Sequence, residues 1–296
     1  MMSSSVHAEG AGSANSTAEP AGSPGEGMLI SADGTAIGYT RMGTGTPVVL
    51  IDGALNDRSF TSGPNQKLAA VLASEFAVFT YDRRGRGQSG DRHPYAIERE
   101  VEDLQAVIDA AGGSACVYGI SSGGALALEA ARRLNSITRL ALYELPFVTD
   151  DSRAPIPADF ADHLTKLVSD QQRGAAVRYF MTTGVGLPRP MVFVMQLLPV
   201  WSRLKHLAHT LPYDARLIEG CGAGGPLPDH RWTGVTVPTL VMAGGKSPAW
   251  MRHAMDALAN ALPNAEHRTL EKQMHIVKPD ALAPVLTRHF HEDPRQ

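Results

Sequence analysis

The chain has 296 residues, of which 43% are hydrophobic, enough for one large domain or two small ones. Its net charge of −3 does not point to a nucleic-acid or membrane-surface partner, and no apolar run is long enough to cross a bilayer. The two cysteines, Cys116 and Cys221, lie far apart and match no metal-site spacing, which favours a reduced, cytoplasmic protein.

Residues 1–27 differ in composition from the rest of the chain. They consist mainly of Ser, Ala, Gly, Glu and Pro, and they carry almost no large apolar side chain. Such a segment buries too little surface to offset the entropy of ordering, so we expect a disordered N-terminal tail. The segment also lacks the apolar core of a secretory signal.

Ordered elements are predicted from residue 28 onward. Two short alternating runs around Asp33–Gly34 predict a hairpin, and continuous apolar runs predict buried strands. These runs cover residues 47–52, 75–82, 114–120, 137–144 and 237–244, with a weaker one at 265–271. Helical periodicity lies between or after them, at residues 95–112, 123–135, 248–264 and 278–290. This alternation predicts an α/β protein whose parallel sheet is covered on both faces.

Residues 146–235 interrupt the alternation. They contain no predicted strand, only helix-like pieces cut by Gly and Pro. We therefore expect a helical insertion in a core formed by residues 28–145 and 236–296. An insertion that leaves the ligand-binding edge of such a sheet favours a lid or substrate pocket, although a purely structural excursion is the alternative.

The stretch Gly119-Ile120-Ser121-Ser122-Gly123 fits the pattern G-x-S-x-G. It follows a predicted buried strand and opens a predicted helix, which is the context that a nucleophile on a strained turn requires. The register makes Ser121 the nucleophile, while Ser122 would supply only its backbone N–H to an oxyanion. An ordinary glycine-rich turn is the alternative, but strand, turn and helix all agree with the motif.

Three further stretches match at their expected places. They are "IDGAL" at 51–55, the complete "DRRGRGQS" at 82–89, and "QMHIV" at 273–277. With them the chain resembles the α/β-hydrolase superfamily over residues 28–290. The resemblance implies an eight-stranded, mostly parallel sheet, helices on both faces and a helical cap after the sixth strand. It also implies His275 as the base, because the family carries its histidine in a loop after the last strand. Of the 11 histidines, His275 lies in that loop and keeps the order serine, acid, histidine.

The second oxyanion N–H would come from the loop after the first buried strand, and Ala54 is the candidate. Here the chain departs from the family, since Asp52-Gly53 replaces the usual His-Gly pair. The Asp52 carboxylate could disfavour anionic substrates or bind a polar group; an Asx turn that stabilises the loop is the alternative.

The acid is missing from its usual place after the seventh strand. Ser247 stands there in "GGKSP", and the nearby Asp256 lies deep in the following predicted helix. Some members, including haloalkane dehalogenases, carry the acid after the sixth strand, where this chain has Glu144. A carboxylate at the end of a buried strand needs a partner, and His275 would supply one. The alternative is a glutamate that turns to solvent.

Together these observations predict a serine hydrolase with a cap, in which Ser121 attacks, His275 transfers the proton and Glu144 orients His275. The mechanism needs neither metal nor organic cofactor, and the expected partner is a hydrophobic small-molecule ester. Thioesters and carbon–carbon bonds remain open as substrates. A ligand-binding protein or a non-hydrolytic biosynthetic enzyme that reuses the fold also remains open.

Overall fold

The computed structural model describes residues 25–60 and 63–292. Eight strands form one sheet in the order β1-β2-β4-β3-β5-β6-β7-β8, which confirms the predicted eight-stranded, mostly parallel sheet. Strand β2 runs antiparallel to both of its neighbours, β1 and β4, and every other neighbouring pair is parallel. The strands are β1 Gly25–Ile30, β2 Ala36–Met42, β3 Thr46–Ile51, β4 Phe76–Tyr81, β5 Ala115–Ile120, β6 Ile137–Tyr143, β7 Thr239–Gly244 and β8 Ala265–Leu270.

The hairpin of β1 and β2 begins earlier than the sequence indicates. Gly25, Glu26 and Gly27 pair with β2, so these residues of the expected tail belong to the sheet. The rest of the predicted tail lies outside the described residues. The alternating pattern predicted the hairpin well, but three small or polar residues at an exposed edge carry no apolar signal.

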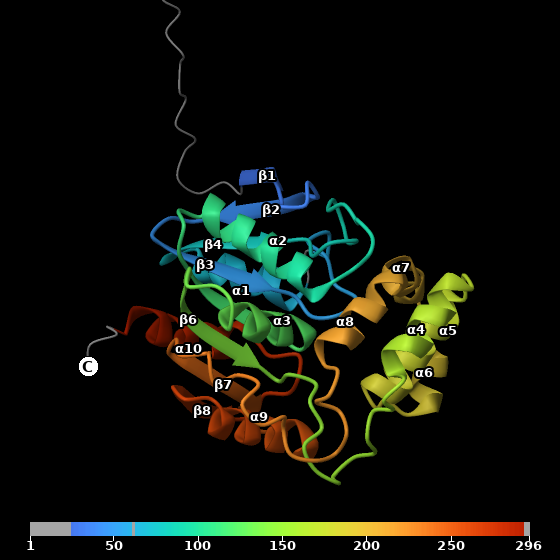
Figure 1. The fold of residues 1–296 in the computed structure, drawn as a ribbon. Coiled ribbons are helices and arrows are strands. Elements are labelled where there is room, and N and C mark those ends of the chain that lie inside the picture. The colour runs from blue at the N-terminus through green and yellow to red at the C-terminus, as the bar shows by residue number, and fades with distance from the viewer. Residues whose placement is uncertain (1–24, 61–62, 293–296) are drawn as a thin grey trace, which may run out of the picture.

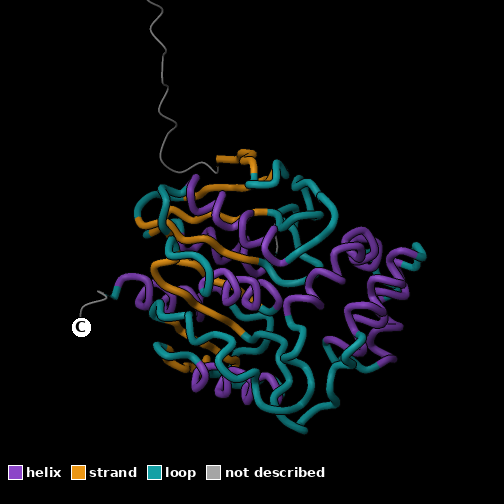
Figure 2. The backbone as a smooth tube through the Cα atoms, in the orientation of Figure 1, coloured by secondary structure: helices purple, strands orange, loops and turns teal. Residues whose placement is uncertain are grey.

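Helices cover both faces of the sheet, as Figures 1 and 2 show. Alternate side chains of the central strands enter two separate cores: Val49 of β3 belongs to the core with α2, α3 and α9, whereas Val48 belongs to the core with α1 and α10. This two-sided burial explains why the strands are continuous apolar runs. The helices of the core are α1 Pro64–Leu72, α2 Ile97–Ala110, α3 Ser122–Ala131, α9 Ala249–Ala261 and α10 Pro279–His291.

Helix α1 was not predicted from the sequence. It has nine residues, begins with Pro64, and buries a narrow stripe that includes Leu68 and Leu72. So short a stripe gives little periodicity to detect, whereas the longer α2 was clear from its repeating apolar positions.

The segment between β6 and β7 is helical and contains no strand within the part of the chain that the structure describes. Figure 1 shows α4 to α7 grouped on one side of the sheet, with α8 leading back toward it. The helices are α4 Phe160–Ser169, α5 Arg173–Tyr179, a π-helical turn Phe180–Gly184, α6 Arg189–Met195, α7 Val200–Leu207, a 3₁₀ turn Ala208–Thr210 and α8 Leu211–Leu217. We call residues 146–235 of this segment the cap. No helix of the described residues is both long and apolar enough to span a membrane.

Candidate active site

Ser121 occupies a sharp turn between β5 and α3. Its φ of 57° lies in the left-handed region, which a non-glycine residue adopts only when the surroundings enforce it. A Cβ on Gly119 would lie 2.5 Å from the Gly123 carbonyl oxygen, and one on Gly123 would lie 2.4 Å from that of Asp52. The two glycines of the motif are therefore required for this turn to pack against its own helix and against the loop after β3.

The loop after β3 approaches Ser121 closely at Gly53. A Cβ on Gly53 would lie 3.0 Å from the Ser121 Cβ and 3.5 Å from its Oγ. The next residue, Ala54, lines the same cavity as Ser121 and Ser122. The structure thus brings together the serine and both residues that were predicted to supply oxyanion N–H groups.

Glu144 stands directly after β6 and is fully buried. Its Oε2 lies 2.9 Å from His275 Nδ1, and its Oε1 accepts a hydrogen bond from the Gly244 N–H at 2.7 Å. Both carboxylate oxygens are therefore engaged, and the alternative of a glutamate turned to solvent is wrong. His275 itself is partly exposed and lines the cavity that contains Ser121.

The turn after β7, where the acid usually stands, packs against the loop that carries His275. The Lys246 N–H donates to the Gln273 carbonyl oxygen at 2.9 Å. Ser247 is buried, and among the described residues its Oγ has no hydrogen-bond partner. Asp256 lies in α9 and pairs instead with His267, its Oδ1 2.9 Å from His267 Nδ1.

Asp52, the departure from the usual histidine, is buried and lines the cavity. Its Oδ1 accepts a hydrogen bond from the Asn56 side chain at 3.3 Å, and no backbone N–H of the described residues donates to the carboxylate, so it forms no Asx turn. Burial raises the pKa of the Asp52 carboxyl to about 7, although nearby Arg86 opposes the shift. The carboxyl therefore changes its charge near neutral pH.

The cavity around Ser121 has a volume of about 350 Å³ and lies between core and cap. Its walls are mainly apolar, which suits a small hydrophobic ligand. The core supplies Leu55, Ile120, Trp250 and Met251, and the cap supplies Phe160, Phe180, Met181, Val185, Leu204 and Ile218.

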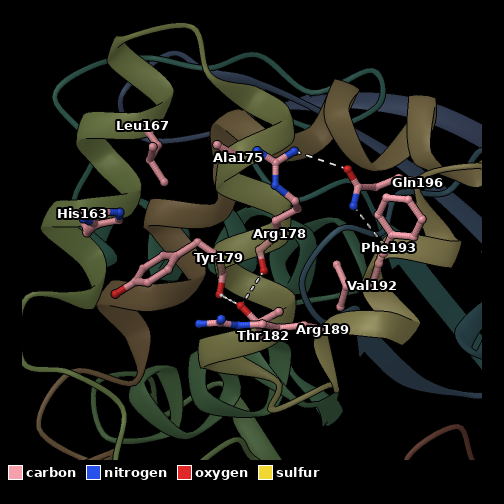
Figure 3. Close-up of a pocket in the computed structure, with 10 residues that line it drawn as sticks. All are labelled: His163, Leu167, Ala175, Arg178, Tyr179, Thr182, Arg189, Val192, Phe193 and Gln196. Atoms are coloured by element: carbon pink, nitrogen blue, oxygen red, sulfur yellow. Dashed lines mark hydrogen bonds between the residues drawn. The ribbon is translucent and has the colours of Figure 1, made fainter.

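A second hollow, of about 510 Å³, lies on the cap among α4, α5 and α6 (Figure 3). Its lining includes His163, Arg178, Tyr179 and Arg189, and it shares no lining residue with the cavity around Ser121. None of the predicted site residues lines this second hollow.

A buried ionic cluster beside Ser122 was missed from the sequence. Arg83 Nη1 donates to Asp214 Oδ1 at 2.7 Å, and Arg86 Nη2 donates to Asp214 Oδ2 at 2.7 Å. The Ser122 hydroxyl also donates to Asp214, at 2.7 Å, a side-chain contact that was not predicted; the role of its backbone N–H toward an oxyanion stays a prediction. Although burial opposes ionisation, the two arginines hold the pKa of Asp214 below its ordinary value. The available signal was a run of three arginines, Arg83, Arg84 and Arg86, in the stretch "DRRGRGQS" that follows a predicted buried strand.

Comparison with known proteins agrees with this architecture. Residues 48–285 match the model of the alpha/beta hydrolase family, and the chain belongs to this family. It is 50% identical to an alpha/beta hydrolase from Sphaerobacter thermophilus DSM 20745, with a TM-score of 0.81 over 89% of this chain and 100% of that one. No curated protein matches the chain.

More distant structures share the fold. An enol-lactonase from Burkholderia xenovorans LB400 is 23% identical, with a TM-score of 0.65 over 89% of this chain and 100% of that one. An esterase from Rhodococcus sp. ECU1013 is 19% identical, with a TM-score of 0.62 over 89% and 97% of the two chains. The family and the 50% identical relative make this chain a hydrolase, and they imply a small-molecule substrate.

Proposed function

We propose that the protein is a serine hydrolase that cleaves an ester-type bond of a hydrophobic small molecule through an acyl-enzyme intermediate. The observation that carries the proposal is the hydrogen-bonding contact between His275 and a fully buried Glu144, on the cavity that also holds Ser121 at its strained turn. A nucleophile, a base and a group that orients the base thus come from three separate loops, as this chemistry requires.

In the first half-reaction the Ser121 Oγ attacks the substrate carbonyl carbon while His275 Nε2 accepts the hydroxyl proton. The carbonyl oxygen becomes an oxyanion, which the N–H groups of Ala54 and Ser122 stabilise. His275 then protonates the leaving alcohol as the carbon–oxygen bond breaks. Glu144 keeps Nδ1 protonated and stabilises the imidazolium throughout.

In the second half-reaction a water molecule loses a proton to His275 and attacks the acyl carbon. The bond to Ser121 breaks, the serine regains the proton, and the carboxylic acid leaves. The apolar walls and the volume of about 350 Å³ favour short or medium acyl groups over long chains.

The test is labelling with a fluorophosphonate probe, together with hydrolysis of esters, thioesters and carbon-leaving-group substrates of graded acyl length. We expect the wild type to react with the probe and the Ser121→Ala variant to be inert in both assays. A wild type that is neither labelled nor active, or a Ser121→Ala variant that retains wild-type turnover, would overturn the proposal. The substrate panel decides which kind of leaving group the site accepts.

A further inference from the structure

The ionic cluster beside Ser122 is unusual in its position. Arg83 and Arg86 follow β4 and Asp214 belongs to α8 of the cap; all three are at most 2% exposed. A second carboxylate, Glu100, pairs with Arg83 at 2.7 Å and balances the charge. Apolar residues of similar volume often stabilise a fold as well as a buried ion pair does, so stability alone does not account for the cluster.

Two hydrogen bonds connect the cluster to the loops on either side of Ser121. The first runs from the Ser122 hydroxyl to Asp214 Oδ1, 2.7 Å apart. The second runs from Arg86 Nη1 to the carbonyl oxygen of Gly53, also 2.7 Å apart. Each loop carries one of the N–H groups that the proposed function assigns to the oxyanion.

The contact with Gly53 acts on Ala54 through the peptide bond. The Gly53 carbonyl and the Ala54 N–H belong to one planar trans unit, so they point in opposite directions. Arg86 holds the carbonyl toward the buried cluster and thereby sets the direction of the N–H. Its positive charge also draws electron density toward the carbonyl oxygen, which makes the N–H a stronger donor.

We propose that Asp214 and Arg86 are positioning residues of the oxyanion hole, and that Asp214 makes the geometry of the hole depend on a seated cap. The inference rests on the proposed function and deepens it. Asp214 holds Ser122 directly and Ala54 through Arg86, so one cap carboxylate fixes both donors. If α8 moved away, Asp214 would leave two buried guanidinium groups undercompensated and both loops untethered.

This arrangement predicts how substrates are distinguished. A substrate that contacts the cap holds α8 in place and thereby improves the alignment of the oxyanion donors. Such contacts should raise kcat, whereas contacts that only bind the ground state would lower KM. We therefore expect kcat to increase with acyl groups that reach the cap residues Phe160 and Ile218, which line the cavity.

The experiment compares Asp214→Asn with Asp103→Asn. Asp103 of α2 is as buried as Asp214, and it accepts hydrogen bonds at 2.7 and 2.8 Å from Arg84, which lies in the same loop as Arg83 and Arg86. Neither Asp103 nor Arg84 forms a hydrogen bond with the two described loops beside Ser121, so this pair is the matched control. Ser122→Ala is the second variant, since it removes the tether but keeps the backbone N–H and every charge. We measure kcat, KM, thermal unfolding and the affinity of a boronic acid, which forms a tetrahedral anion on the serine.

We expect Asp214→Asn and Ser122→Ala to lower kcat about 10-fold to 100-fold, somewhat less than outright removal of an oxyanion donor. The KM should change less than about threefold, and boronic acid affinity should fall in parallel with kcat. Asp103→Asn should retain the wild-type kcat within about threefold, even if its unfolding temperature falls as much as that of Asp214→Asn. Equal kcat in all three variants, or losses that follow unfolding temperature alone, would overturn the inference. A wild type without Ser121-dependent turnover would instead overturn the proposed function, and the inference with it.

Discussion

Glu144 became the candidate acid because no carboxylate stands at the usual acid position after the seventh strand. The usual acid position holds Ser247, and Glu144 stands at the end of the sixth strand, the second place where some members of the family carry the acid. The structure joins Glu144 to His275 and to the Gly244 N–H, contacts that span 131 and 100 residues. The sequence analysis predicted the contact with His275 but not the one with the Gly244 N–H, because only the pairing of β6 with β7 brings that N–H beside Glu144.

We expect Glu144→Gln to reduce kcat by about 10⁴-fold, since an orienting carboxylate that becomes an amide favours the wrong histidine tautomer. The measurement is steady-state ester hydrolysis against the Ser121→Ala background. Asp256→Asn is the matched control, because it breaks another histidine–carboxylate pair, the one with His267. Near-normal activity of Glu144→Gln would reject Glu144 as the acid.

Asp52 should make stability depend on pH in a particular direction. Its pKa is about 7 in the folded protein against an ordinary value of 3.8, so the folded state holds a proton that the unfolded state has released. The free energy of unfolding therefore falls as pH rises from about 4 to about 7. Asp52→Asn does not lose stability in this way. The difference in free energy of unfolding between Asp52→Asn and the wild type should therefore shift in favour of the variant by on the order of 2 kcal/mol between pH 5 and pH 8.

Urea denaturation at several pH values measures the effect. Asp109→Asn, at an exposed position of α2, is the control and should run parallel to the wild type. The same ionisation places a negative charge beside the oxyanion, so the ratio of Asp52→Asn activity to wild-type activity should rise through pH 7. Parallel stability curves for Asp52→Asn and the wild type would contradict the assigned burial of this carboxyl.

The elements were predictable to different degrees, for physical reasons. Strands buried on both faces were clear because every residue in them must be apolar, and α2 was clear because it is long and amphipathic. The short α1 was missed, as were the first residues of β1. The Arg86–Asp214 contact was also beyond prediction: it joins a core loop to a cap helix 128 residues away, and ion pairs across such distances leave no periodic pattern.

The turn between β5 and α3 should tolerate no side chain at its second glycine. A Cβ on Gly123 would meet the backbone carbonyl oxygens of Asp52 and Ile51 at 2.4 and 2.6 Å, and backbone atoms cannot move aside cheaply. We expect Gly123→Ala to lower the free energy of unfolding by about 1–3 kcal/mol or more and to displace the loop with Ala54. Gly225→Ala, where nothing lies within 4 Å of the added carbon, is the control for chemical denaturation. Equal stability of the two variants would contradict this packing.

Core and cap meet at the cavity through an ion pair as well as through apolar walls. Arg203 of α7 lies 3.0 Å from Asp57 of the core and over the ring of Phe60, 4.3 Å from its centroid. Arg203 also lines the cavity, so the contact ties the cap down beside the cavity.

We expect Arg203→Met to weaken this closure more than it weakens the fold. The free energy of unfolding should fall by only about 1 kcal/mol, since the arginine is partly exposed. Amide hydrogen exchange in α7 should become several-fold faster. Lys166→Met, which removes an exposed pair at the C-terminal end of α4, is the control and should leave exchange in α7 unchanged. Unchanged exchange in Arg203→Met would show that the ion pair does not hold the cap.

The unused hydroxyl of Ser247 has a consequence for how such sites can change during evolution. Because its turn packs against the loop of His275 while the proposed acid, Glu144, follows β6, the molecule offers a second place from which an acid could serve the same histidine. An acid could then move between strands through an intermediate that carries both. We expect the double variant Glu144→Gln with Ser247→Asp to turn over substrate at least about tenfold faster than Glu144→Gln alone. This gain is a small part of the loss of about 10⁴-fold expected for Glu144→Gln. If the double variant is no faster than Glu144→Gln alone, an acid in the turn after β7 cannot serve His275.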